Sequence, residues 1–226
     1  MRHRITQRTD YILKACAGRT VLHLGCADMP YTRMRLADGT LLYSMIDGVA
    51  ARQYGLDLSA EGIAVLAEAG HQDLAISDVQ QLVEQKPFGE TRFDVIIAGE
   101  IIEHLSNPGL FLESLKPLLS DSPTRLILTT INAYCAYRFF YSLVMRDESV
   151  HPDHVSYYSR KTLTGLLSRH GYVVEDFSFY PIGREHKQYI NRGRTRLLYW
   201  VDRLAALAAP MLGDGLIVTC SVRTQK

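Results

Sequence analysis

Long apolar runs and paired cysteines are both absent from this chain of 226 residues. No uninterrupted apolar stretch reaches the roughly 20 residues that a membrane-spanning helix needs, and the start of the chain, MRHRITQRTD, lacks the apolar core of a secretory signal. The four cysteines are far apart and form no CxxC pair, so the sequence predicts neither a disulfide framework nor a zinc cage. These absences favour a reduced, cytoplasmic setting.

An excess of charge of either sign is also missing. The chain carries 25 Lys and Arg residues against 24 Asp and Glu residues, which gives a net charge of +1. Because proteins that bind polyanions usually present a basic surplus, nucleic acid is not favoured as a partner. The length suits one α/β domain with a substantial core and is too short for two of ordinary size.

Strand-like and helix-like patterns alternate along the chain, with no repeat and no linker between them. The predicted strands are Thr20 to Gly25, Gln53 to Leu58, Asp73 to Ser77, Phe93 to Ala98, Arg125 to Thr129, Tyr172 to Tyr180 and Leu216 to Val222. This alternation predicts one α/β domain over residues 1–226, a doubly wound and mostly parallel seven-stranded sheet with helices on both faces. The last strand follows a helical insertion, about residues 184–213, rather than a simple crossover. We therefore expect it to run antiparallel, at or near the edge of the sheet.

Three of the predicted helices have recognisable starting residues. Ser59 offers an N-cap to a helix that stops at Gly70, and Ser159 offers one to a helix that stops at Gly171. A third helix opens with Asn107 and Pro108, and proline is favourable at the first helical position because its missing N–H would be unpaired there. These helices account for the segments between the strands.

The segment Phe93 to Leu105, FDVIIAGEIIEHL, combines a buried strand with ligand-type side chains. Gly99 allows a close backbone approach, and Glu100, Glu103 and His104 then follow at i, i+3 and i+4, a spacing that predicts one face of a helical turn. Open α/β sheets bind their ligands at the carboxyl ends of their strands. The segment is therefore expected to form an edge of the active site.

The turn after the first strand, in VLHLGCADMP, discriminates between two cofactor types. A dinucleotide site favours glycine at three places spaced GxGxxG, which here read Gly25, Ala27 and Pro30. An S-adenosylmethionine site needs the tight turn and then an acidic residue at the end of the next strand to accept the ribose hydroxyls. Asp57 stands at that place, so the second cofactor fits better.

Four segments, VLHLGCAD, GLDLSAEGI, ISDVQQL and FDVIIAGEIIEHL, occur in this order and resemble the motifs of class I S-adenosylmethionine-dependent methyltransferases. The resemblance implies the Rossmann-like fold of that family and covers nearly the whole chain, because His151 to Tyr172 resembles the segment before the family's late helix. It departs from the family in the first turn, where the usual GxGxG reads Gly25, Ala27, Met29, and on the first strand, where His23 replaces a customary acid. The resemblance assigns cofactor binding to Gly25, Cys26, Ala27, Asp57, Leu58, Asp78, Val79 and Gly99.

In this family the turn holds the amino-acid end of the cofactor, and the second and third strands hold the ribose and the adenine. By resemblance Asp57 would bind the ribose, and Asp78 with Val79 would bind the adenine. Since the sulfonium carbon is already activated, the protein must mainly align a nucleophile and remove its proton. His104, His154 and Glu103 are the expected catalytic residues.

A metal-dependent mechanism is an alternative for the same residues. The ExxEH pattern with a later DH element resembles the metal site of small-RNA 2′-O-methyltransferases, and quinone-biosynthesis O-methyltransferases have EH after the same strand. A divalent ion, Mg²⁺ or Mn²⁺, would then be held by Glu100, Glu103, His104 and His154. In the structural alternative Glu103 and His104 merely cap and pair within their turn.

The methyl acceptor is expected to be an oxygen, less favourably a nitrogen, of a small molecule or glycan intermediate. An aromatic cluster, Tyr134 to Met145, would stack on an acceptor ring or close a hydrophobic lid. The apolar face of Arg192 to Leu212 would pack on the domain, form a homodimer, or contact a membrane surface with a lipid-linked acceptor. RNA 2′-O-methylation, a non-catalytic cofactor-binding module and a nicotinamide oxidoreductase are the rival functions.

Overall fold

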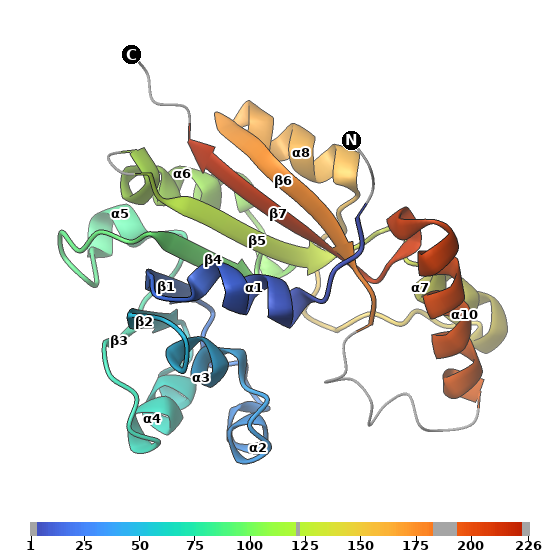
Figure 1. The fold of residues 1–226 in the computed structure, drawn as a ribbon, viewed down its shortest axis with the longest axis horizontal. Coiled ribbons are helices and arrows are strands. Elements are labelled where there is room, and N and C mark those ends of the chain that lie inside the picture. The colour runs from blue at the N-terminus through green and yellow to red at the C-terminus, as the bar shows by residue number, and fades with distance from the viewer. Residues whose placement is uncertain (1–3, 121–122, 183–193, 223–226) are drawn as a thin grey trace.

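The computed structural model describes residues 4–120, 123–182 and 194–222. These residues form one seven-stranded sheet with helices on both faces (Figure 1). The strands are β1 (Thr20–Leu24), β2 (Arg52–Asp57), β3 (Leu74–Ile76), β4 (Val95–Gly99), β5 (Arg125–Ile131), β6 (Tyr172–Tyr180) and β7 (Gly215–Val222). The α-helices are α1 (Arg8–Cys16), α2 (Thr32–Ala37), α3 (Leu42–Asp47), α4 (Ala60–Glu68), α5 (Leu82–Gln85), α6 (Pro108–Ser120), α7 (Ala136–Met145), α8 (Arg160–Arg169) and α10 (Arg194–Ala208). Two short 3₁₀ turns are η1 (Ile102–His104) and η3 (Pro210–Leu212).

The strand order is β3-β2-β1-β4-β5-β7-β6. The first five strands are parallel to one another, and β7 pairs antiparallel with both β5 and β6. The prediction of a mostly parallel doubly wound sheet with an antiparallel last strand is therefore confirmed. That strand lies one place in from the edge, because β6 occupies the edge itself.

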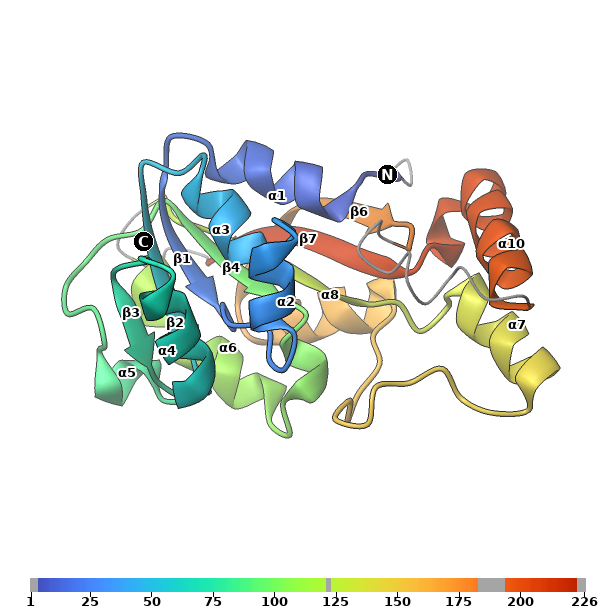
Figure 2. The ribbon, with the colours of Figure 1, turned by 90° about the horizontal axis from the view of Figure 1, so that it is seen from below.

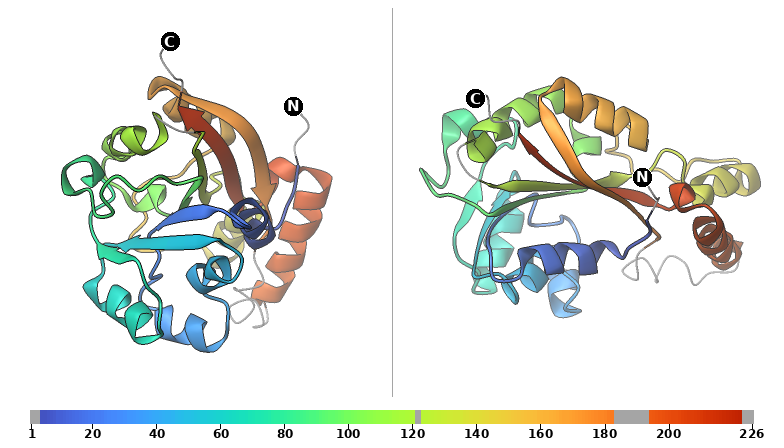
Figure 3. Two further views of the ribbon diagram at one scale, coloured as in Figure 1. Left: turned by 60° about the vertical axis from the view of Figure 1, so that its left-hand side comes forward. Right: turned by 45° about the horizontal axis from the view of Figure 1, so that its top comes forward.

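Alternating side chains of the central strands bury two faces of the sheet. Val21 of β1 and Ile97 of β4 pack with α1 and α3, whereas Leu22 and Ile96 beside them pack with α6 and α8. Figure 2 and the right panel of Figure 3 show these two helical layers on opposite sides of the strands. Residues buried on both faces are what a parallel sheet requires, and they explain why the strands read as continuous apolar runs.

The predicted helix starts are confirmed by hydrogen bonds at the caps. Ser59 Oγ accepts from Gly62 N at 3.0 Å and Asn107 Oδ1 accepts from Leu110 N at 3.0 Å. Ser159 forms a capping box with Thr162, in which each side chain binds the other residue's backbone N–H. Such caps pair N–H groups that the first helical turn leaves without partners, and each is worth about 1 kcal/mol.

Helices α7 and α10 pack against each other beyond the carboxyl end of β5 (Figure 1). Asn132, just after β5, donates through Nδ2 to Met211 O at 2.9 Å and Gly213 O at 2.7 Å, which ties η3 to the sheet. The expected insertion at about 184–213 thus contains α10 and η3, while its residues 184–193 lie outside the described part. Among the described helices none is long and apolar enough to cross a membrane.

Candidate active site

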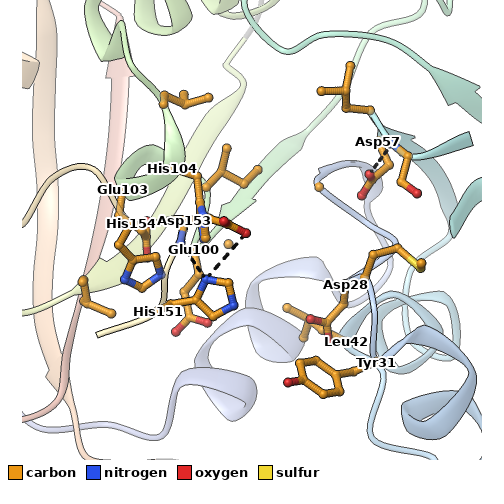
Figure 4. Close-up of a pocket in the computed structure, with 18 of the residues that line it drawn as sticks. Asp28, Tyr31, Leu42, Asp57, Glu100, Glu103, His104, His151, Asp153 and His154 are labelled. Atoms are coloured by element: carbon orange, nitrogen blue, oxygen red, sulfur yellow. Dashed lines mark hydrogen bonds and ion pairs between the residues drawn. The ribbon is translucent and has the colours of Figure 1, made fainter. Parts of the chain in front are cut away.

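A cavity of about 1270 Å³ opens at the carboxyl edge of the parallel strands. The loops after β1, β2 and β3 line one side of it, and the loop after β4 lines the other together with residues 148–154. Figure 4 shows the two sides facing each other, with Asp57 and Asp28 opposite Glu100 and three histidines. The volume exceeds what a single small ligand occupies, so the cavity has room for a cofactor and an acceptor together.

The turn after β1 is shaped for close approach by a ligand. Gly25 has φ +65°, a left-handed conformation that favours glycine, and a Cβ atom there would meet the Ile101 side chain at 2.9 Å. Gly25 N and Cys26 N both donate to Leu56 O, at 2.7 and 3.2 Å, which fixes the turn against β2. Gly25 and Cys26 line the cavity.

Asp57, at the end of β2, connects this turn to the start of α4. One carboxylate oxygen accepts from Ala27 N at 2.8 Å and the other from Ser59 N at 2.9 Å. A carboxylate offers about four acceptor positions, so Asp57 keeps capacity for two ligand hydroxyls in the cavity that it lines. Ala27 itself is fully buried and supports the site through its N–H.

The loop after β3 presents the remaining residues expected to bind the cofactor. Asp78 and Val79 line the cavity, and the loop is fixed because Ser114 Oγ donates to Val79 O at 2.5 Å and Gln80 N donates to Asp78 Oδ1 at 2.8 Å. Leu58 lies at the cavity rim with 72% of its surface exposed, where it can cover a bound ring. These residues, with the turn and Asp57, fit the three parts of S-adenosylmethionine.

His23 on β1, where the family resemblance predicts an acid, is a buried neutral ring. It is 2% exposed, and its Nδ1 makes no hydrogen bond within the described residues. Burial first, and the nearby Arg8 charge second, lower the pKa of His23 to about 3. The strand therefore carries no charge at this place at neutral pH.

The acceptor side begins with Glu100, whose backbone departs from the expected helix. Glu100 has φ +57°, and only the 3₁₀ turn η1 follows it. The prediction that Glu100, Glu103 and His104 share one helical face is thus wrong, because Glu100 is left-handed and lies outside the 3₁₀ turn that holds the other two, although all three line the cavity. Tyr180 donates to Glu100 Oε1 at 2.7 Å, and Arg8 Nε lies 3.8 Å from that oxygen. Gly99 lines the cavity just before them.

Glu103 is fully buried at the inner wall of the cavity. Its Oε2 accepts from Thr130 Oγ1 at 2.9 Å, whereas its Oε1 makes no hydrogen bond within the described residues. Burial, helped by the neighbouring Glu100 charge, raises the pKa of Glu103 to about 7. A carboxyl group that titrates near neutral pH is suited to accept or donate a proton.

His104 and His154 do come together, and His151 joins them. The centroids of the three rings lie 4.5 to 5.7 Å apart. Burial and the neighbouring histidines lower the pKa of His104 and bring that of His154 to about 4, so both rings are neutral at pH 7. His151 was missing from the predicted catalytic and metal-binding sets, although the i, i+3 spacing in HPDH is a signal for it.

Comparisons with known proteins identify the family of the chain. A family model described as "Methyltransferase domain" matches residues 1–176. Ubiquinone biosynthesis O-methyltransferase of Glaesserella parasuis is 29% identical over 121 residues, which are 51% of this chain and 46% of that protein. A "Probable S-adenosylmethionine-dependent methyltransferase" of Mycolicibacterium smegmatis is 29% identical over 162 residues, 71% of this chain and 54% of the other.

The chain spans about half the length of these curated relatives. The fold is also that of a SAM-dependent methyltransferase from Archaeoglobus fulgidus, with a TM-score of 0.56 at 16% identity over 94% of this chain and 90% of that one. The family match covers most of the chain and includes the β1 turn, Asp57, Asp78 and the β4 loop. This protein therefore belongs to the class I S-adenosylmethionine-dependent methyltransferase family.

Proposed function

We propose that the protein transfers a methyl group from S-adenosylmethionine to an oxygen atom of a small molecule or glycan intermediate. The observation that supports this most directly is the shared cavity. The residues that fit the cofactor line one side of it, and Glu103, His104 and His154 line the other. A methyl donor and a group that can take up a proton would then face each other across the acceptor.

The cofactor side would bind and orient. Asp57 would accept the two ribose hydroxyls, Asp78 and Val79 would hold the adenine edge, and Gly25 and Cys26 would lie against the amino-acid end. When bound, S-adenosylmethionine supplies an electrophilic methyl group on its sulfonium sulfur. Alignment of the acceptor oxygen with that carbon at near-attack distance is the main contribution required of the protein.

The acceptor side would remove the hydroxyl proton. A free hydroxyl is a weak nucleophile at neutral pH and needs a base to take its proton. An imidazole with a pKa below 7 is mostly unprotonated near neutral pH and can therefore act as that base. His104 and His154 are in that state because burial and mutual proximity lower their pKa. Glu103 lies on the same wall and would orient the imidazoles or receive the proton.

An aromatic side chain at the cavity and the names of two matched relatives support an oxygen atom as the methyl acceptor. Two of the matched relatives are named ubiquinone biosynthesis O-methyltransferase. In this chain Tyr141 of α7 lines the acceptor end of the cavity, whereas Phe139 on the same helix is 67% exposed. The aromatic cluster after β5 would thus use Tyr141 to contact an acceptor and turn other rings outward.

Binding and product analysis test the proposal separately. Calorimetry with the demethylated cofactor should show binding to the full chain, and NAD should show none. Incubation with isotopically labelled S-adenosylmethionine and separate panels of phenols, hydroxylated sugars and RNA oligonucleotides should label an oxygen of a small acceptor. Binding of NAD alone would contradict the cofactor assignment, and labelling of RNA alone would contradict the acceptor class.

A further inference from the structure

We propose that His104, His151 and His154 form a binding site for a divalent transition-metal ion at the acceptor end of the cavity. One potential ligand atom from each residue lies within 4.8 Å of the other two. This inference deepens the proposed function. The role of the ion in the reaction rests on that function, whereas the binding of the ion does not.

The arrangement of the three rings is close to that of a metal site. The His104 ring meets the other two at steep angles, 72° to His151 and 81° to His154, so the rings do not stack face to face. Metal–nitrogen distances of about 2.0–2.1 Å in a tetrahedral zinc site separate the ligand nitrogens by about 3.4 Å. Because His104 and His151 are exposed, small side-chain rotations can bring the three nitrogens to that separation.

The backbone already holds the two segments that carry these rings. His154 N donates to His151 O at 3.0 Å, which closes a turn with both residues in it. Val155 N and Ser156 N both donate to Glu103 O, at 2.9 and 3.2 Å, and so tie this loop to η1. The fold itself therefore holds these two segments together, although they lie some fifty positions apart in the sequence. The ion does not need to supply the conformational free energy that brings them together.

Asp153 provides the outer contacts that metal-binding imidazoles usually have. The His104 ring is hydrogen bonded to the Asp153 backbone, and His151 Nδ1 accepts from Asp153 N at 3.3 Å, with the Asp153 carboxylate 3.8 Å away. A ligating imidazole donates through its outer nitrogen, so with an ion at Nε2 the His151 ring would carry its proton on Nδ1, beside the Asp153 carboxylate. Figure 4 shows Asp153 between the His104 and His151 labels, on the cavity side of the loop.

The donor set selects the class of ion and revises the sequence-based expectation of Mg²⁺ or Mn²⁺ held by two carboxylates and two imidazoles. Glu100 already accepts from Tyr180 and lies beside Arg8, and Glu103 accepts from Thr130. Three imidazoles suit Zn²⁺, Co²⁺, Ni²⁺ or Fe²⁺, whereas Mg²⁺ prefers oxygen ligands. We therefore assign the carboxylates a place beside the ion rather than among its ligands.

Such an ion would give the three histidines a role in the proposed reaction. A divalent ion with an open coordination position lowers the pKa of a hydroxyl group bound to it. With the imidazoles holding the ion, Glu103 would receive the acceptor proton in place of His104 or His154, because Glu103 Oε1 has no partner within the described residues. Figure 4 shows Glu103 on the same side of the cavity as His154.

Metal binding by the full, untagged chain tests the site without reference to activity. Calorimetry with Zn²⁺ should show one saturable site, and the Co²⁺ form should show visible absorption of a nitrogen-rich site of low coordination number. His151→Ala should weaken Zn²⁺ binding by at least about 100-fold, since loss of an outer contact alone costs 10–100-fold. His170→Ala is the matched control, because His170 pairs with Glu113 away from the cavity, and its Zn²⁺ affinity should be unchanged.

Each alternative outcome overturns the inference. Absence of saturable Zn²⁺ binding, or equal affinity in the wild type, His151→Ala and a second variant, His151→Asn, would reject the three-histidine site. Binding of Mg²⁺ that depends on Glu100 and Glu103 but not on His151 would reject it in favour of a carboxylate site. Binding of the demethylated cofactor to the wild type is measured in parallel. If the wild type does not bind it, the result counts against the proposed function and not against the metal site.

Discussion

The methyl group of Ala27 occupies the space that a side chain at position 62 would need. A Cβ atom on Gly62 would lie 2.4 Å from Ala27 Cβ and 3.1 Å from Met29 Cγ. The start of α4 thus packs directly against the β1 turn. The alanine in this turn is therefore matched by a glycine on the facing helix.

Gly62→Ala should disturb the turn that faces the cofactor. Overpacking of this kind costs about 1–3 kcal/mol, and we expect a loss of that size in the free energy of unfolding, together with weaker binding of the demethylated cofactor. Urea unfolding and calorimetry measure the two effects. The double variant Ala27→Gly/Gly62→Ala should recover most of both, because it removes the opposing methyl group.

Gly165→Ala is the matched control for this pair. Gly165 lies in α8 with nothing within 4 Å of an added Cβ, so alanine there should stabilise the helix by roughly 0.5–1 kcal/mol. If the double variant at positions 27 and 62 shows the same losses of stability and cofactor affinity as Gly62→Ala alone, the Ala27 contact is not the cause of those losses.

Asp57→Ala should reduce cofactor affinity by about 1–3 kcal/mol, because two hydrogen bonds to ribose hydroxyls are lost. The substitution also releases Ala27 N and Ser59 N, which should loosen the turn. Calorimetry with the demethylated cofactor measures the change. Asp94→Ala is the control, since Asp94 also accepts from a backbone N–H, that of Thr20, but at the opposite edge of the sheet. Equal affinities in all three proteins would refute the assignment.

Asp78→Ala should weaken binding of the demethylated cofactor while the fold stays intact. The carboxylate would accept from the exocyclic amine of adenine, and loss of one such hydrogen bond costs on the order of 1 kcal/mol. Comparison of adenosine with inosine adds a direct check, because only adenosine carries the amine, so only adenosine binding should fall in the variant. A structure with the adenine bound elsewhere would contradict this prediction.

Asp202 in α10 should make stability depend on pH. It is fully buried, its Oδ1 accepts from Tyr137 N, and its Oδ2 has no hydrogen bond within the described residues. Burial first, and the nearby Asp214 charge second, raise the pKa of Asp202 to about 6. Because the folded pKa is raised, the contribution of Asp202 to the free energy of unfolding is fully present below its pKa in the unfolded chain, near 4. That contribution is lost as the pH rises through about 6.

Asp202→Asn should therefore be more stable than the wild type at pH 7.5, by roughly 2–3 kcal/mol, and nearly equal to it at pH 4. Urea unfolding at several pH values measures the difference between the two proteins. Asp38→Asn, a change at an exposed residue after α2, is the control and should show no such trend. A difference that stays constant from pH 4 to 7.5 would exclude titration of Asp202 as its source.

The sheet and the cofactor side of the site could largely be predicted from the sequence, because they depend on local patterns. Caps such as Ser159 act within one helical turn, and parallel strands bring the side chains after each strand to a common edge. Asp57 and Asp78 needed only their strands to be correctly placed, and both line the cavity. The neighbouring Ala27 supports the turn through its N–H, which a spacing pattern does not distinguish from direct contact.

The acceptor side could not be predicted in the same way, because it depends on backbone conformation and on distant segments. A left-handed Glu100 followed by a 3₁₀ turn is not visible in an i, i+3, i+4 pattern. The place of His151 depends on the hydrogen bonds of Val155 and Ser156 to Glu103 O, which join segments about fifty residues apart. Tyr180 reaches Glu100 from β6, a contact that no local motif indicates.

Tyr180 and Gly215 are partners in the register of β6 and β7, and a Cβ atom on Gly215 would fall within the Tyr180 ring. The chain thus leaves the sheet and returns to it at the same point. Because the cost of closing a loop grows only slowly with its length, the length of the connection between these two positions places little constraint on how the two strands pair. The register of β6 against β7 is therefore set by the ladder that ends at Tyr180 and Gly215 and not by the length of the segment between them.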